Sequence, residues 1–172
     1  MRQPTNNRHL WPVWLALALW IGAWNASAGE SPTDREVPSG AKCPVCGMFV
    51  AKYPEWVALA RWSDGTVHYF DGAKDLFRFL ANPERHAPGR DPAGIGELYV
   101  TDYYGLKRIP ARSAWYVAGS DVHGPMGHEL IPLAHEQEAR EFMQDHGGRK
   151  LLRFEQITTD ILSALDKTGE AP

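Results

Sequence analysis

The chain has 172 residues, and its 18 Lys and Arg side chains against 21 Asp and Glu give a formal net charge of −3. Proteins that bind nucleic acids or anionic lipids usually present a basic surface or a polybasic stretch. This chain is mildly acidic and has no polybasic stretch. The composition therefore argues against both as partners. The length suits one domain of ordinary size or two very small ones.

The first 28 residues have the pattern of a secretory signal peptide. Arg2 and Arg8 give a positive start, residues 10–21 are apolar throughout, and Ala26-Ser27-Ala28 supplies small residues for cleavage. The alternative is an uncleaved N-terminal anchor, although the apolar run barely reaches the roughly 18 residues that a membrane span needs. No Cys adjoins the cleavage region, so acylation there is not expected. We therefore expect an exported protein.

The leader is followed by a linker and then by a hairpin. Residues 29–40 are polar, Pro-bearing and unpatterned, which predicts a flexible linker before a domain over 41–165. The short apolar and aromatic run 56–62 predicts a strand, and residues 66–70 predict its return. The Asp-Gly pair at 64–65 is favoured in tight hairpin turns.

A helix is predicted directly after this hairpin. Its buried face is marked by apolar residues at i, i+3, i+4 and i+7, namely Ala73, Leu76, Phe77 and Leu80. Asp71 is the expected N-cap, and Asn82-Pro83 ends the helix. The charged, Gly- and Pro-bearing segment 84–96 predicts a surface loop, and residues 97–102 predict a further strand.

The second half of the chain follows the same order. Residues 114–119 and 128–133 predict two strands, and residues 150–154 predict a closing strand. Between them a helical face is formed by Ala139, Phe142, Met143 and His146, and Gly147-Gly148 ends that helix.

The two halves therefore share one plan. Moving Phe70, Leu76 and Phe79 forward by 63 positions gives Leu133, Ala139 and Phe142, all apolar. We predict an α+β fold of two packed ββαβ units, at about 41–105 and 110–157. Internal duplication and the chance rhythm of a small α+β domain both remain open as explanations.

The motif Cys43-Pro44-Val45-Cys46-Gly47-Met48 carries two thiols and a thioether, soft donors that select Cu(I). Gly47 in place of His excludes haem attachment. A closed zinc site needs two more ligands, which His could supply. Dithiol exchange favours a second Cys that enters a helix, whereas Gly47–Val50 predicts an extended segment. A disulfide would close too short a loop to stabilise much.

A second group of donors lies in the connection 120–127 and at its end. This connection is longer than a hairpin turn requires, and loops on a rigid scaffold often carry function. Met126 and His128 there are candidate ligands, provided that the loop lies near Cys46 and Met48. The alternative is an ordinary surface Met and His. The chain has no Gly-x-Ser-x-Gly, phosphate-loop or His-Glu-x-x-His motif, so we do not expect an enzyme.

The combination of three segments resembles the NosL family over residues 41–157. These segments are the Cys43–Met48 motif, Met126-Gly127 leading into HELIPL, and Tyr69-Phe70-Asp71-Gly72 at the start of the first helix. The resemblance implies a periplasmic Cu(I) carrier that supplies nitrous oxide reductase, alongside other maturation proteins. Many members carry a lipoprotein Cys at the cleavage site, where this chain has Ala28-Gly29.

The resemblance also implies ligands. Cys46 and Met48 match the family's Cys-x-Met core, and Met126 matches its Met-Gly methionine, whereas His128 is a candidate on its chemistry alone. We expect a monomeric copper chaperone whose candidate ligands are Cys43, Cys46, Met48, Met126 and His128. The rival hypotheses are a dithiol oxidoreductase that uses the two Cys residues and a zinc-stabilised structural module.

Overall fold

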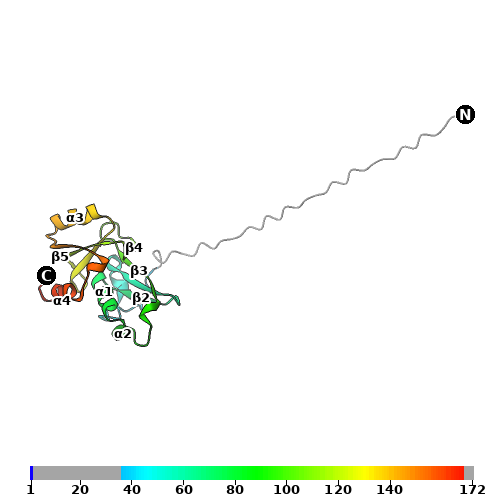
Figure 1. The fold of residues 1–172 in the computed structure, drawn as a ribbon, viewed down its shortest axis with the longest axis horizontal. Coiled ribbons are helices and arrows are strands. Elements are labelled where there is room, and N and C mark those ends of the chain that lie inside the picture. Colours follow the sequence, from blue (N-terminus) through cyan, green and yellow to red (C-terminus); the bar gives the residue numbers. More distant parts are fainter. Residues whose placement is uncertain (2–35, 169–172) are drawn as a thin grey trace.

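The computed structural model describes Met1 and residues 36–168 (Figure 1). Apart from Met1, the leader predicted over 1–28 lies outside the described residues, as does the linker up to residue 35. No helix within the described part is both long and apolar enough to cross a bilayer.

The first half folds as an antiparallel sheet and a helix. Its elements are β1 (Ala58–Trp62), β2 (Val67–Phe70), α1 (Ala73–Ala81), β3 (Ile95–Thr101) and β4 (Arg108–Pro110). The strand order is β2-β1-β3-β4, so β4 adds an edge strand that the sequence pattern did not predict. The predicted hairpin is confirmed: β1 and β2 are joined at the Asp-Gly pair, and Gly65 has a φ of +86°.

Helix α1 forms where the apolar periodicity predicts it, and its apolar face is buried at Leu76, Phe77 and Phe79. The prediction that Asp71 caps it is wrong, because the N-cap residue is Gly72 and no side chain caps the helix. The segment 84–96 is not a plain loop. It contains most of a short helix, α2 (Pro83–His86), and a 3-10 turn at Pro92–Gly94.

The second half repeats the arrangement. Its elements are β5 (Trp115–Gly124), β6 (Gly127–Leu133), α3 (Glu136–Asp145) and β7 (Lys150–Arg153), with strand order β6-β5-β7. The order matches β2-β1-β3 of the first sheet, which confirms the predicted α+β fold of two ββαβ units. The 63-residue offset also carries the first residue of α1, Ala73, onto the first residue of α3, Glu136.

The connection 120–127 is not the long loop that the sequence suggested. β5 continues to Gly124 and β6 begins at Gly127, so only Pro125 and Met126 form the turn. His123 lies opposite His128 in this extension, and an irregularity between Ala118 and His123 interrupts the register. Met126, His123 and His128 therefore lie together at the tip of the β5–β6 hairpin.

A final helix, α4 (Thr159–Thr168), was not predicted, and it runs beyond the expected domain end at residue 165. It packs against α1 and β6, with Ile161, Leu162 and Leu165 buried. These three residues lie at i, i+1 and i+4, so the sequence did contain the signal of one buried helical face.

The two units share one main core. α1 packs on β1 and β2 of its own sheet and also on β6 of the other. The Phe77 ring of α1 lies 5.2 Å from Tyr116 in β5 and 4.9 Å from Phe154. A smaller cluster joins α3 to the second sheet through Val117, Ile131, Leu133, Ala139 and Phe142.

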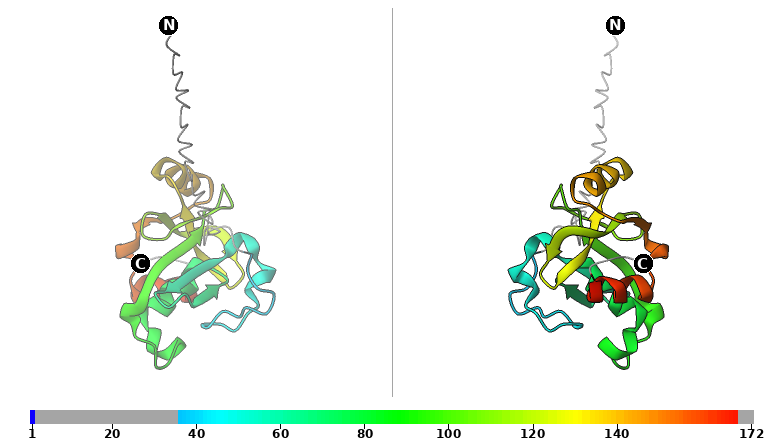
Figure 2. Two further views of the ribbon diagram at one scale, coloured as in Figure 1. Left: turned by 90° about the vertical axis from the view of Figure 1, so that its right-hand side faces the viewer. Right: turned by 90° about the vertical axis from the view of Figure 1, so that its left-hand side faces the viewer.

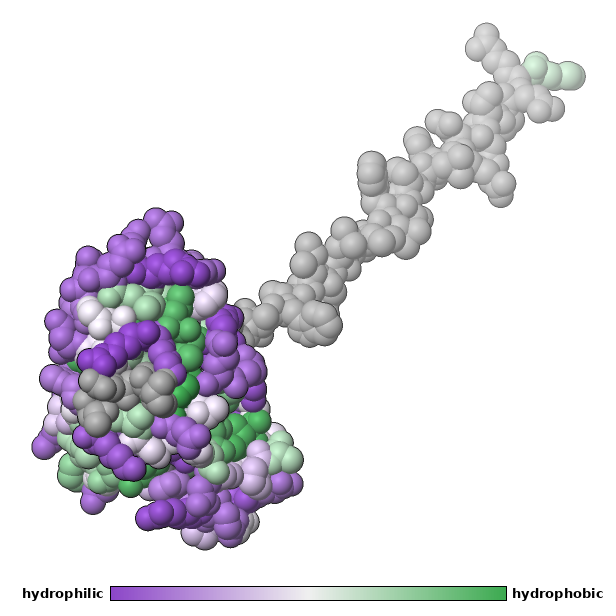
Figure 3. Space-filling view, turned by 60° about the vertical axis from the view of Figure 1, so that its left-hand side comes forward, coloured by the Kyte–Doolittle hydropathy of each residue, from purple (hydrophilic) through white to green (hydrophobic). Residues whose placement is uncertain are grey.

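The two helices α3 and α2 lie at opposite ends of the molecule (Figure 2). The face that Figure 3 shows is mainly hydrophilic, with a strip of apolar residues.

Candidate metal centre

The Cys motif folds as a tight knuckle that precedes β1. Lys42 and Phe49 form an isolated antiparallel bridge, and inside it the Cys43 amide donates to the Met48 carbonyl oxygen at 2.9 Å. The Gly47 amide donates to the Cys43 carbonyl oxygen at 2.8 Å, and Gly47 has a φ of +80°. That left-handed backbone favours glycine, so the residue after the second Cys is fixed by the turn.

The knuckle places both thiols against the start of α1. The Cys43 Sγ donates to Asp75 Oδ2 at 3.3 Å, and the Cys46 Sγ donates to Asp71 Oδ1 at 3.1 Å. One ligand atom from each of these four residues lies within 4.8 Å of the others. Asp71 lies two residues before α1 and Asp75 lies in its first turn, and both carboxylates contact the knuckle thiols.

This group is largely removed from solvent. Cys43, Asp71 and Asp75 are buried, with at most 2% of their surface exposed, while Cys46 is half-buried. Asp75 also accepts a hydrogen bond from Arg78 at 2.8 Å through its other oxygen. Oδ2 of Asp71 is buried and has no hydrogen-bond partner among the described residues.

Burial controls the acidity of both thiols. It raises the pKa of Cys43, although the backbone amides of Cys46 and Val45 partly oppose it. Burial likewise raises the pKa of Cys46 to about 12, with the neighbouring carboxylates adding to the rise and the Met48 amide opposing it. Without a cation, both sulfurs are therefore protonated at neutral pH.

The hairpin tip docks on the first turn of α1. The Lys74 Nζ donates to the backbone carbonyl oxygen of Met126 at 3.3 Å and also to that of His128. The Lys74 backbone amide donates to Glu129 Oε1 at 2.6 Å. Burial raises the pKa of Glu129 to about 7. The knuckle and the tip, distant in sequence, therefore contact the same short stretch of chain.

The five predicted ligands are thus distributed over two neighbouring structures. Cys43 and Cys46 lie in the four-residue group, and Met48 is half-buried in the same knuckle. Met126 is 44% exposed at the hairpin turn, and His128 is half-buried with its ring 4.5 Å from that of His123. His128 is not a member of the four-residue group, so the convergence of all five residues on one ion stays a prediction.

Sequence reasoning missed Asp71 and Asp75. Asp71 was interpreted as a helix cap, but its side chain accepts the Cys46 thiol instead. Asp75 falls between the apolar positions of α1 and is nevertheless buried. The available signal was a pair of carboxylates four residues apart, one just before α1 and one in its first turn, and only the position of the knuckle gives that pair a meaning.

A pocket of about 370 Å³ adjoins the knuckle between α1, α2 and α4. Val45, Arg78 and Asp166 are among its lining residues, so it reaches the neighbours of Cys46 and Asp75. His86 also lines this pocket and its Nδ1 lies 3.3 Å from the Pro44 carbonyl oxygen. The knuckle therefore borders an open surface depression.

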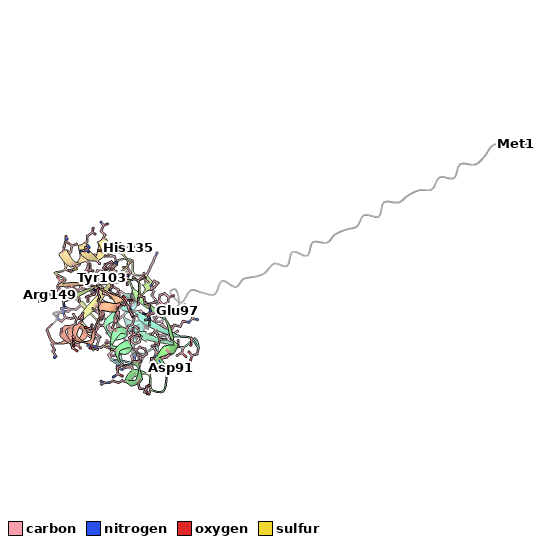
Figure 4. All side chains as sticks on the ribbon, viewed as in Figure 1. Met1, Asp91, Glu97, Tyr103, His135 and Arg149 are labelled. Carbon is pink, nitrogen blue, oxygen red and sulfur yellow. The ribbon has the colours of Figure 1, made fainter. Side chains whose placement is uncertain are left out.

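The remaining histidines have other surroundings. His68 stacks on Phe79 with ring centroids 5.5 Å apart, and His146 stacks on Phe142 at 4.4 Å. His135 is the N-cap residue of α3 and lies at that end of the molecule, whereas Asp91 lies at the α2 end (Figure 4). None of these histidines belongs to the four-residue group among the described residues.

Comparison with known proteins gives a consistent result. The NosL family profile matches residues 34–162. The chain is 32% identical over 132 residues to the copper-binding lipoprotein NosL of Stutzerimonas stutzeri. The aligned region covers 70% of this chain and 64% of that protein. The chain thus spans less than two thirds of that relative's length.

A solved structure is also similar. The crystal structure of the copper chaperone NosL from Shewanella denitrificans superposes with a TM-score of 0.62 at 30% identity. The match covers 74% of this chain and 98% of that one. The family profile extends over most of the chain, from before the knuckle into α4, and on that match the chain belongs to the NosL family.

Proposed function

We propose that this chain is an exported Cu(I)-binding chaperone that passes copper to nitrous oxide reductase or to a protein that matures it. The observation that carries the proposal is the pair of free thiols, Cys43 and Cys46, held together in one knuckle beside the docked hairpin tip. The related proteins named above as a copper-binding lipoprotein and a copper chaperone support copper as the cargo.

The donor chemistry supports monovalent copper. Thiolate and thioether sulfur are soft ligands, and Met48 adds a thioether two residues after Cys46. The hairpin tip adds Met126 and His128 as further candidate ligands. Met126 is 44% exposed and Cys46 is half-buried, so a partner's ligand could reach the ion and displace these donors one at a time. We propose transfer by such ligand exchange.

The thiol acidity disfavours dithiol exchange as the function. Nucleophilic cysteines have a lowered pKa, because the thiolate is the attacking species. Burial and two carboxylates act in the opposite direction on Cys46 and raise its pKa to about 12. A cation bound at the site would have the opposite effect and lower the pKa of the thiols, because it stabilises the thiolates.

We place the mature protein in the periplasm, on the strength of the N-terminal leader pattern and the resemblance to the family. Membrane association would follow only from a retained leader, because Ala28-Gly29 offers no Cys for a lipid. We propose that the chain acts as a monomer and is not an enzyme.

The test is an anaerobic titration of the purified protein with Cu(I), with Zn²⁺ and without metal, in competition with a chromophoric Cu(I) chelator. The proposal expects Cu(I) binding that is lost in Cys46→Ser. Disulfide exchange without metal, together with no Cu(I) affinity, would overturn it.

Delivery is tested separately by mixing copper-loaded protein with metal-free nitrous oxide reductase. Another metal-free copper protein serves as the control for specificity. We expect faster recovery of nitrous oxide reduction than with the same amount of chelated copper. Equal recovery from both copper sources would contradict a role in delivery.

A further inference from the structure

The turn between β3 and β4 carries two of the most exposed large apolar side chains among the described residues. Leu106 is 63% exposed and Tyr104 is 48% exposed. We propose that this turn, residues 102–107, is the docking site for the protein that receives copper, which would present an apolar pocket bordered by Lys or Arg. The inference rests on the proposed function for the identity of the partner, but it concerns a surface outside the four-residue group.

Leu106 has a backbone conformation that few residues of its kind adopt. Its φ is +51°, and no other non-glycine residue in the described part of the chain has a positive φ. Glycine occupies the left-handed region at little cost, whereas a Leu there is strained by its Cβ. The strain brings little packing in return, because most of the residue's surface is exposed. A strained residue that the fold itself does not need indicates a functional constraint.

The turn is held rigidly, although its apolar side chains are exposed. The buried carboxylate of Asp102 accepts the Gly105 amide at 2.6 Å and, through its other oxygen, the Ala134 amide at 2.8 Å. The Asp102 carbonyl oxygen accepts the Leu106 amide at 2.9 Å, and its amide donates to the Lys107 carbonyl oxygen at 2.8 Å. A segment that is already ordered loses little conformational entropy when a partner binds. The turn is therefore preorganised as a contact surface.

Aromatic rings also fix the position of Tyr104. Its ring packs edge-on against Tyr103, with centroids 5.2 Å apart, and against Phe142 of α3 at 6.2 Å. Tyr103 lies at the α3 end of the molecule, close to His135 (Figure 4). Tyr recurs at the energetic centres of protein interfaces, because its ring buries a large area at a low cost in entropy. A fixed Tyr beside an exposed Leu therefore suits an apolar pocket on a partner.

The surroundings of the turn are acidic, which determines the kind of partner. Helix α3 carries three carboxylates whose charges act on Tyr104, those of Asp145, Glu141 and Glu138. Slight burial raises the pKa of the Tyr104 hydroxyl, and these charges add to the rise. Oε2 of Glu138 is also buried without a hydrogen-bond partner among the described residues. Lys or Arg around the partner's pocket would complement this surface, because facing charges in an interface are usually opposite in sign.

The docking turn is separated from the proposed copper ligands. It contacts the end of β6, where the Tyr103 amide donates to the Pro132 carbonyl oxygen at 2.9 Å. Met126 directly precedes the other end of that strand, so about six residues, or roughly 20 Å, separate the two places. A standard interface covers roughly 800 Å² on each partner, about 30 Å across, so one partner can contact both. Binding at the turn would leave the copper ligands free for exchange.

The experiment measures binding of the metal-free protein to metal-free nitrous oxide reductase and, separately, to each of its maturation proteins. Leu106→Gly removes the apolar side chain and relieves the strained backbone. We expect this variant to unfold at the same or a higher urea concentration than the unaltered protein. Its affinity for the partner should nevertheless fall by about tenfold or more. Leu106→Met keeps an apolar side chain and should bind the partner nearly as the unaltered protein does.

Two charge reversals test the chemistry of the partner. Asp145→Lys places a positive charge near Tyr104 at the end of α3, where the helix dipole tolerates a cation. It should slow association with the partner, and the effect should shrink as salt is added. Glu84→Lys is the matched control, because α2 lies at the opposite end of the molecule from α3 (Figure 2). It should leave the association rate unchanged.

Copper delivery separates this inference from the proposed function. Leu106→Gly should bind Cu(I) as the unaltered protein does and should transfer it more slowly when the partner is below saturation. The inference is overturned if none of the probe proteins binds, if Leu106→Gly binds its partner normally, or if Asp145→Lys does not slow association. A loss of stability in Leu106→Gly would likewise overturn it, because Leu106 would then serve the fold. A protein that docks through this turn but binds no Cu(I) would refute the copper function and leave the docking site standing.

Discussion

The Lys74 Nζ donates a hydrogen bond to the backbone carbonyl oxygen of Met126 at 3.3 Å, which joins the first turn of α1 to the tip of the β5–β6 hairpin. Lys74 is only 2% exposed, and it lies directly before Asp75, the partner of the Cys43 thiol. Lys74 therefore holds the hairpin tip next to the segment that carries Asp75, a member of the four-residue group.

Lys74→Met should loosen the hairpin tip, because it removes the donor to two backbone carbonyls and the ion pair to Asp166. We expect the free energy of unfolding to fall by about 2 kcal/mol, the cost of leaving partly buried acceptors unpaired. Amide hydrogen exchange around Met126 should become faster. Exposed Lys107→Met is the control, and equal exchange at the tip in both variants would refute this role.

Met126→Ala tests the second half of the copper site. Met126 is 44% exposed, so its removal should leave the melting temperature nearly unchanged. If its thioether is a ligand, Cu(I) affinity should fall by about tenfold or more. Leu106→Ala, at an apolar side chain that is 63% exposed, is the control and should bind Cu(I) normally. Undiminished Cu(I) binding by Met126→Ala would remove Met126 from the site.

Gly72→Ala should destabilise the junction between α1 and the hairpin. A Cβ at Gly72 would collide with the carboxylate of Glu129, which hydrogen bonds to the Lys74 and Leu130 amides hold in place. We expect a loss of about 1–3 kcal/mol in unfolding by urea, as for other overpacked sites. Gly40→Ala is the matched control, because nothing lies within 4 Å of its Cβ position. Similar stabilities would show that Glu129 can move.

His68 should make the fold sensitive to acid. Burial, aided by Arg90, lowers its pKa below the usual 6.5, and its Nε2 is buried without a hydrogen-bond partner among the described residues. Below about pH 6.5 the unfolded chain gains a proton at His68 that the folded chain does not. The stability contributed by neutral His68 is thus present above that pH and is lost as the pH falls towards its folded-state pKa.

The measurement is urea unfolding at about pH 7.5 and about pH 5.5. His68→Phe preserves an aromatic ring between Trp62 and Phe79, and it should lose less stability on acidification than the unaltered protein. Exposed His135→Gln should behave as the unaltered protein does. An unchanged pH dependence in His68→Phe would assign the acid sensitivity to other groups.

Much of the fold could be predicted because its signals are local. The apolar spacing of Leu76 and Phe77 marks α1, the Asp-Gly pair marks the first hairpin, and Gly147 marks the end of α3. The hairpin tip was misjudged because Gly124 and Gly127 indicate a loop by composition, yet they pair across the extended strands. Strand pairing depends on the partner strand, and a single segment does not encode it.

The sequence by itself determined the donor types: the knuckle thiols, Met48 and Met126 follow from residue identity and from the turn that Gly47 permits. Only the tertiary structure decided that Asp71 and Asp75 lie beside those thiols and that Lys74 fixes the hairpin tip on the same helix. These contacts join segments separated by 25 residues or more, from Cys46 to Asp71 at the least. They form because α1 packs on both sheets at once, and no local pattern records which surfaces that packing brings together.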